Sequence, residues 1–152
     1  MTERVPLLSL LLSVAGLLTS AYLSYTHFDR SALVCSEDAV VDCGTVTTSD
    51  QSELFGIPVA FLGLAFFAFL TVVCLPFAWR IEALKWVRLG AVGVGVLMVV
   101  YLVAAELLII GKICLWCTVV HIITLALAYL LVAASLRENT ASLRENTAAG
   151  HE

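Results

Sequence analysis

The stretch Gly111-Lys112-Ile113-Cys114-Leu115-Trp116-Cys117-Thr118 stands where a charged, glycine-containing break gives way to a long apolar run. That run, residues 113–136, carries no formal charge and is long enough to cross a bilayer as a helix. A helix that begins here places Cys114 and Cys117 in its first turn, on one face. Backbone N–H groups point outward at a helix N-terminus, and the helix dipole there favours a thiolate over a thiol. The spacing also suits a reversible disulfide, so this pair is the first candidate for redox chemistry.

The composition excludes a soluble globular domain. Of the 152 residues, 61% are apolar and 13% are charged, and the mean hydropathy is +1.02, whereas average domains are about 45–50% apolar and ~25% charged. Four stretches have the roughly 20 mainly apolar residues that a membrane span needs; they are residues 5–26, 57–79, 89–110 and 113–136. The sequence therefore predicts an all-α integral membrane protein, a bundle of four transmembrane helices.

The predicted organisation is one transmembrane redox domain, residues 1–134, followed by a solvated cytoplasmic tail, residues 135–152. In the tail the heptapeptide Ser-Leu-Arg-Glu-Asn-Thr-Ala occurs twice. A cleaved signal peptide is the alternative for residues 5–26, but their apolar stretch exceeds the ~7–15 residues usual for one. The net charge of −4 and the lack of a basic patch give no indication of nucleic-acid binding.

The basic residues predict the orientation in the membrane. Six of the eight fall on one side of the predicted spans, namely Arg4, Arg80, Lys85, Arg88, Arg137 and Arg144, and two fall on the other, Arg30 and Lys112. Basic residues gather on the cytoplasmic side, so both termini should be cytoplasmic. The acidic connection at residues 28–56 and the turn at Gly111-Lys112 should then lie outside, where disulfides persist.

Four of the five cysteines form two pairs on this outer face, Cys35 with Cys43 and Cys114 with Cys117. Thiol–disulfide exchange passes two electrons through a mixed disulfide, so two pairs make a two-step relay. The loop pair can meet a soluble protein, whereas the helix pair borders lipid, where the carrier that accepts two electrons and two protons is a quinone. Purely structural disulfides and a zinc site are the alternatives. The first gains little from the small loop between Cys114 and Cys117, and the second would place all four ligands at a lipid boundary.

Other ionisable residues in the predicted spans are candidates for function by default. His121 follows Cys117 by four residues on the same helix face, so it could hydrogen-bond a quinone oxygen, move a proton, or simply bond a neighbouring helix. Glu106 lies one turn before the outer end of its span and is either functional or solvated. Cys74 is expected to be a buried structural thiol. Lys112 could favour a nearby thiolate but is more simply explained as a solvated turn residue.

The order of these residues resembles the vitamin K epoxide reductase family, whose bacterial members are quinone-coupled disulfide-forming enzymes. The resemblance covers nearly all of the chain before the tail. It is carried by Cys35 and Cys43 with seven residues between them, Val46, Ser49, Phe55-Gly56-Ile57-Pro58-Val59-Ala60, Gly63 and Cys114-Leu115-Trp116-Cys117. It implies a four-helix bundle around a quinone, capped by the outer loop and a short helix within that loop.

The resemblance also implies a role for each cysteine. Cys117 would lie beside the quinone ring, with Cys114 as its disulfide partner. Cys43 would attack Cys114, and Cys35 would face the external partner. The residues expected at the quinone are Ser49, Phe55 and His121, the last standing where vertebrate members carry a tyrosine.

Two departures from the family pattern affect these expectations. Asp50-Gln51 stands where many relatives have a more apolar or aromatic pair, so the cap could close differently. Many bacterial members also carry a fused thioredoxin-like domain, which these 152 residues do not contain. The resemblance therefore implies a separate thioredoxin-fold protein, periplasmic or otherwise extracytoplasmic, as the partner.

The first hypothesis is a thiol oxidase of the bacterial plasma membrane, with its active site on the outer face. It would pass electrons from the reduced partner to ubiquinone or menaquinone. A second hypothesis is reduction of vitamin K or its epoxide. A third, of another class, is a non-catalytic membrane scaffold with structural disulfides.

Overall fold

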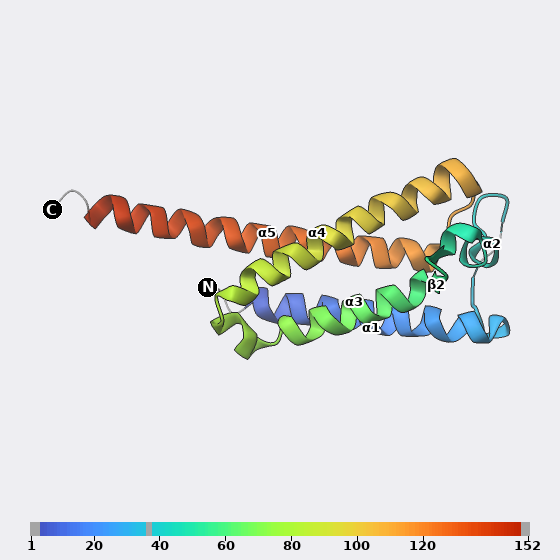
Figure 1. Cartoon of the computed structure of the whole chain (residues 1–152), viewed down its shortest axis with the longest axis horizontal. Coiled ribbons are helices and arrows are strands. Elements are labelled where there is room, and N and C mark those ends of the chain that lie inside the picture. Colours follow the sequence, from blue (N-terminus) through green and yellow to red (C-terminus); the bar gives the residue numbers. More distant parts are fainter. Residues whose placement is uncertain (1–3, 36–37, 150–152) are drawn as a thin grey trace.

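The computed structural model describes residues 4–35 and 38–149. Four helices run lengthwise through the molecule (Figure 1): α1 (Arg4–Phe28), α3 (Val59–Val73), α4 (Ala83–Ala104) and α5 (Leu115–Ala149). The last turns before the final connection, η4 (Ala105–Ile110), continue α4 as a π-helix. Helix α1 packs against α3 and α5, and α4 packs against α5.

Three of the helices in the described part of the chain are long and apolar enough to cross a membrane. These are α1, α4 together with η4, and α5 through Arg144. Helix α3 has 15 residues, or roughly 22 Å at 1.5 Å per residue, and is shorter than the ~30 Å hydrocarbon core of a bilayer. The structure therefore confirms a helical membrane protein, while the helix found where residues 57–79 predicted a span is shorter than expected.

The early end of α3 has a local cause. Pro76 lacks an N–H and disfavours helical backbone at the residue before it, and Leu75 accordingly has an extended ψ of 143°. The chain then forms the short 3-10 helix η3 (Pro76–Arg80). Helix α5, in contrast, continues without a break past residue 135 into the duplicated heptapeptide, so the described part of the predicted tail is helical.

A stripe of small residues on α1 brings this helix close to α3. Ser9, Ser13, Gly16, Ser20 and Ser24 are buried at three- and four-residue spacing, as the packing of helices through small residues requires. A Cβ at Gly16 would overlap the ring of Phe67 on α3.

Close packing at a glycine also joins α3, α4 and α5. At Gly95 on α4, an added Cβ would meet the ring of Phe66 and the methyl group of Thr124. The apolar core lies between these contacts and consists of Phe67, Leu70, Val73, Val92, Leu127 and Leu131.

The short elements of the outer loop gather at one end of the bundle, while α1 begins and α5 ends at the opposite end (Figure 1). They are η1 (Arg30–Ala32), α2 (Cys43–Thr47), η2 (Asp50–Ser52), and the two-stranded antiparallel hairpin of β1 (Glu53–Leu54) and β2 (Ile57–Pro58). The expected short helix within the loop is therefore present as α2.

The other end of the bundle is fixed by a buried arginine. The guanidinium of Arg88 on α4 donates to the carbonyls of Val73 and Ala78 at 3.1 and 3.4 Å, and it lies 4.1 Å from the ring centroid of Trp79. The indole N–H of Trp79 in turn donates to the carbonyl of Cys74. The bonds to Val73 and Cys74 occupy carbonyls that the end of α3 leaves without helical partners.

Candidate functional site

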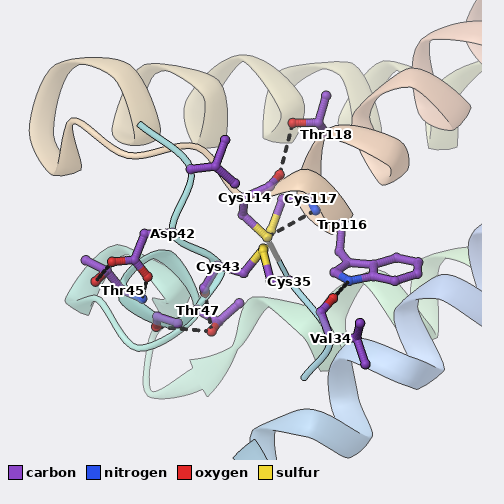
Figure 2. Close-up of a disulfide and its surroundings, with 12 residues drawn as sticks. Val34, Cys35, Asp42, Cys43, Thr45, Thr47, Cys114, Trp116, Cys117 and Thr118 are labelled. Atoms are coloured by element: carbon purple, nitrogen blue, oxygen red, sulfur yellow. Dashed lines mark hydrogen bonds between the residues drawn. A yellow bond between two sulfur atoms is a disulfide. The ribbon is translucent and has the colours of Figure 1, made fainter. Parts of the chain in front are cut away.

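The two cysteine pairs meet at the end of the bundle that carries α2 and the hairpin of β1 and β2. Cys35 and Cys43 form a disulfide, whereas Cys114 and Cys117 are thiols. Cys43 and Cys114 are both 0% exposed and belong to one buried cluster with Val46, against which Cys35 and Cys117 pack. Figure 2 shows the disulfide beside the helix thiols. The arrangement brings together two pairs that are about 70 residues apart in the chain.

Two aspartates shape the loop that carries Cys43. The carboxylate of Asp38 accepts the backbone N–H groups of Val40 and Val41. The carboxylate of Asp42 caps α2 by accepting the N–H and the hydroxyl of Thr45. The N–H groups of Val41 and Val40 lower the pKa of Asp38, and the Thr45 hydroxyl and N–H lower the pKa of Asp42. Both carboxylates therefore hold the loop best in their ionised form.

The helix pair is positioned by the start of α5. Gly111, in the left-handed region with φ 68°, ends η4, and its missing side chain makes that conformation accessible. The carbonyl of Cys114 accepts the N–H and the hydroxyl of Thr118. The Cys114 sulfur accepts the N–H of Cys117 at 3.3 Å, as Figure 2 shows.

The helix N-terminus thus acts on Cys114 rather than on Cys117. Hydrogen bonds from the thiol and the N–H of Cys117 lower the pKa of the Cys114 thiol, even though burial opposes this. The sequence predicts that the N-terminus of this helix favours the thiolate of the deeper cysteine, Cys117. The geometry favours the thiolate of Cys114, because its sulfur is the one that an outward-pointing N–H reaches.

Hydrogen bonds on both sides of the disulfide hold the loop over the helix pair. Before Cys35, the indole N–H of Trp116 donates to the carbonyl of Val34 at 2.8 Å. Before Cys43, a parallel bridge joins Val41 to Ile113. In that bridge, Ile113 donates to the carbonyl of Val40 and Asp42 donates to the carbonyl of Ile113. The loop is therefore tied directly to the residues that flank Cys114.

Tyr22 on α1 also helps to hold the loop over the helix pair, and we call Tyr22, Ile113 and Trp116 together the clamp. Its hydroxyl donates to the carbonyl of Ala32 at 3.0 Å and accepts the N–H of Val34 at 2.9 Å. Its ring lies 4.8 Å, centroid to centroid, from that of Trp116. Lys112, expected to be solvated, donates to the carbonyl of Ala39 at 2.8 Å. Sequence reasoning missed these contacts, because their partners are backbone carbonyls and N–H groups that no side-chain pattern marks.

A cavity of about 740 Å³ lies among the helices and under the outer loop. Cys117, His121 and Ser49 line it, and His121 is 6% exposed. The hydroxyl of Ser49 donates to the carbonyl of Val46. Most of the lining is apolar, and its remaining polar side chains include Thr26, His27, Arg30, Asp42, Thr48, Gln51, Glu106 and Thr124. The size and the mixture of many apolar with few polar groups are typical of a small-molecule site.

Phe55 is the predicted site residue that the structure does not bring to this cavity. It occupies the two-residue turn between β1 and β2, where Phe55 and Gly56 both have positive φ, 54° and 77°. A hairpin turn of this type matches the twist of the strands but directs its central side chains outward. The Phe55 side chain is accordingly 96% exposed, and its prediction as a quinone contact is not supported by the geometry.

Comparison with known proteins agrees with this architecture. The model of the vitamin K epoxide reductase family matches residues 7–132, which include both cysteine pairs, all of α3 and α4, and most of α1 and the first half of α5. No curated protein gives a significant match. Membership supports a membrane oxidoreductase that works on thiols and disulfides, in agreement with the disulfide, the neighbouring thiols and the membrane-spanning helices. The chain therefore belongs to the vitamin K epoxide reductase family.

Proposed function

We propose that the protein is a thiol oxidase that passes two electrons from a reduced thioredoxin-fold protein to a quinone and thereby supports disulfide formation. Electrons enter at Cys35 and Cys43, move to Cys114 and Cys117, and leave to ubiquinone or menaquinone. The proposed location is the bacterial plasma membrane. The distribution of basic residues favours both termini on its cytoplasmic side, so that the cysteines face the outer side.

One observation carries the proposal: Cys43 is buried against Cys114, while Cys117 lines the cavity. Each helix thiol therefore has its own neighbour, one toward the loop pair and the other toward a small-molecule site. A structural disulfide needs no such neighbours, and a scaffold needs no cavity at its thiols.

The exchange between the pairs balances without a further reagent. With Cys114 and Cys117 oxidised, the thiolate of Cys43 attacks the sulfur of Cys114, and Cys117 leaves. Cys35 then attacks Cys43, which releases Cys114. One disulfide has formed in the loop and one has been reduced on the helix. The described structure, with the loop pair oxidised and the helix pair reduced, corresponds to the state after this transfer.

The cavity supports a quinone as the electron acceptor. A quinone supplies two carbonyl oxygens that take up protons as its ring takes up electrons. The apolar lining suits the ring and tail of a lipid-soluble molecule, while Ser49 and His121 offer polar groups at the cavity wall. The name of the family adds vitamin K epoxide as a second candidate substrate, since the same dithiol could reduce it to the quinone and water.

The test is quinone reduction by purified protein in lipid nanodiscs, with a reduced thioredoxin-fold dithiol protein as donor. We expect one quinone consumed per donor disulfide formed, followed by quinone absorbance and by thiol trapping of the donor. Cys114→Ala should lose this activity, whereas the matched control Cys74→Ala, a buried cysteine outside both pairs, should keep it.

Two results would contradict the proposal. Wild-type turnover in Cys114→Ala would show that the relay is not used, and no quinone reduction by the wild type would favour the scaffold. Turnover of vitamin K epoxide but not of quinone would favour the second substrate.

A further inference from the structure

Glu106 is a buried acidic side chain at the end of α4. It lies in η4, the π-helical end of α4, and is 6% exposed. It lines the same cavity as Cys117, one of the two reacting thiols. Ile110 of the same segment packs against the buried cluster that contains the other thiol, Cys114.

No ion pair involves Glu106 among the residues that the structure describes. The other titratable groups around the cavity are His27, Arg30, Asp42, Cys117 and His121. A buried carboxylate without a cationic partner is costly, whereas the protonated acid is much less so. Ionisable residues are rare inside membrane spans and usually have a function. The position therefore suits a carboxyl group that holds a proton and gives it up when needed.

The proposed reaction needs such a group, because a quinone takes up two electrons and two protons. The sulfur of Cys114 accepts the N–H of Cys117 at 3.3 Å, which favours a thiolate at Cys114. A reduced pair with a thiolate at Cys114 holds one proton, on Cys117. The pair supplies both electrons but only one of the two protons.

We propose that Glu106 carries the second proton and is a catalytic residue for quinone reduction; this inference rests on the proposed function. The Cys114 thiolate, the Cys117 thiol and the Glu106 carboxylic acid react with the quinone. The products are the Cys114–Cys117 disulfide, the Glu106 carboxylate and the hydroquinone. The S–H bond of Cys117 and the O–H bond of Glu106 break, while one S–S bond and the two O–H bonds of the hydroquinone form. The two thiol sulfurs are oxidised, the quinone is reduced by two electrons, and the net charge does not change.

The loop exchange then restores Glu106. The two thiols of Cys35 and Cys43 lose two protons as their disulfide forms. One proton returns to Cys117 and the other to the Glu106 carboxylate, which leaves Cys114 again as the thiolate. Glu106 thus stores the proton of a loop thiol between the two half-reactions.

The test separates these half-reactions. Protein reduced at all four site cysteines is mixed with a short-chain ubiquinone in a single turnover, without protein partner, over a range of pH. Glu106→Gln keeps the size of the side chain but carries no transferable proton. We expect it to slow quinone reduction by about 10²-fold or more, the usual contribution of a general acid or base. The rate should also fall more steeply with rising pH, because the second proton must come from water.

Glu53→Gln is the matched control, since it makes the same substitution at an exposed residue of the outer hairpin. It should keep the wild-type rate and pH profile. Glu106→Asp, which retains a proton donor, should recover part of the rate. Thermal unfolding of all variants shows whether each is folded.

The outcomes distinguish the two proposals. No quinone reduction by the wild type would overturn the proposed function. A folded Glu106→Gln variant with the wild-type rate and pH profile would overturn the role of Glu106 alone. Equal slowing in Glu106→Asp and Glu106→Gln, with an unchanged pH profile, would also overturn it, because that pattern indicates a packing role.

Discussion

The two cysteine pairs differ in what holds them in place. The loop pair, Cys35 and Cys43, lies between short turns fixed by the carboxylates of Asp38 and Asp42. The helix pair, Cys114 and Cys117, belongs to the first turn of a long helix packed against the rest of the bundle. Hydrogen bonds of the loop and the burial of Cys43 hold the first pair, whereas a long packed helix carries the second.

This difference matches the tasks that the relay assigns to them. A pair that must meet a soluble protein and then a buried thiol has to move, and local structure held by few buried contacts opens most easily. A pair that must present one sulfur to a cavity has to stay in place. The hydrogen bonds of Trp116 and Tyr22 attach the loop that carries Cys35 to the helices, and they hold the loop closed without a covalent bond to the helix pair.

Removing one of the site thiols should have the largest effect on electron transfer between the two pairs. Cys117→Ser leaves Cys114 without its partner on the helix, so quinone reduction should be abolished. In Cys35→Ser, attack of Cys43 on the Cys114–Cys117 disulfide should leave a Cys43–Cys114 disulfide. In Cys117→Ser, the Cys114 thiolate can form the same bond by attacking the Cys35–Cys43 disulfide, which releases the Cys35 thiol. Peptide mapping under non-reducing conditions detects this cross-link in both variants. A Cys35–Cys114 cross-link instead would reverse the roles of the two loop cysteines, and the absence of any cross-link in both variants would end the relay.

The next largest effect is expected at His121. If it holds the quinone or passes one of the two protons on to it, His121→Ala should slow quinone reduction by about 10²–10⁴-fold, while exchange between the loop pair and the protein partner stays near the wild-type rate. Both steps can be measured separately in the same preparation. Lower thermal stability with normal quinone kinetics would assign His121 a structural role.

A smaller effect is expected when the clamp is weakened. Trp116→Phe keeps a ring beside Tyr22 but removes the hydrogen bond to Val34, which contributes about 0.5–1.5 kcal/mol. Opening of the loop should become more frequent, by a factor of at most about ten, and the rate of hydrogen exchange of its amides should rise by the same factor. Trp86→Phe, at an exposed position on α4, is the control. Identical exchange in both variants would show that the indole N–H does not hold the loop.

The smallest effect is a pH dependence of the loop itself. Because the pKa of Asp42 is lowered in the folded loop, its contribution is present above the unfolded value of ~3.9 and is lost as pH falls through the folded value. Amide protection around Thr45 should therefore decrease in acid. Asp42→Asn should flatten this decrease, whereas Asp50→Asn, an exposed acid of the same loop, should retain it. A wild-type acid profile in Asp42→Asn would place the sensitivity elsewhere.

Particular residues show where prediction from sequence succeeded and where it failed. The small-residue stripe at Gly16, Ser20 and Ser24 predicts an inward helix face, and the structure confirms it, since close approach of helices depends on local side-chain size. Phe55 lies inside a recognisable motif, yet its place in a positive-φ turn directs it outward. A motif specifies residue types, whereas the turn geometry determines where a side chain points.

The sequence by itself determined the class of the protein. Apolar length specifies a helical membrane protein because backbone groups in lipid must bond within a helix, and the spacing of the cysteines marks both redox pairs. Only the tertiary structure decided which sulfur the N–H of Cys117 reaches, which thiol borders the cavity, and that Glu106 lines the same cavity. Those relations join α4, α5 and the outer loop, segments far apart in the chain, and depend on how their backbones are held together by the Trp116, Tyr22 and Ile113 hydrogen bonds.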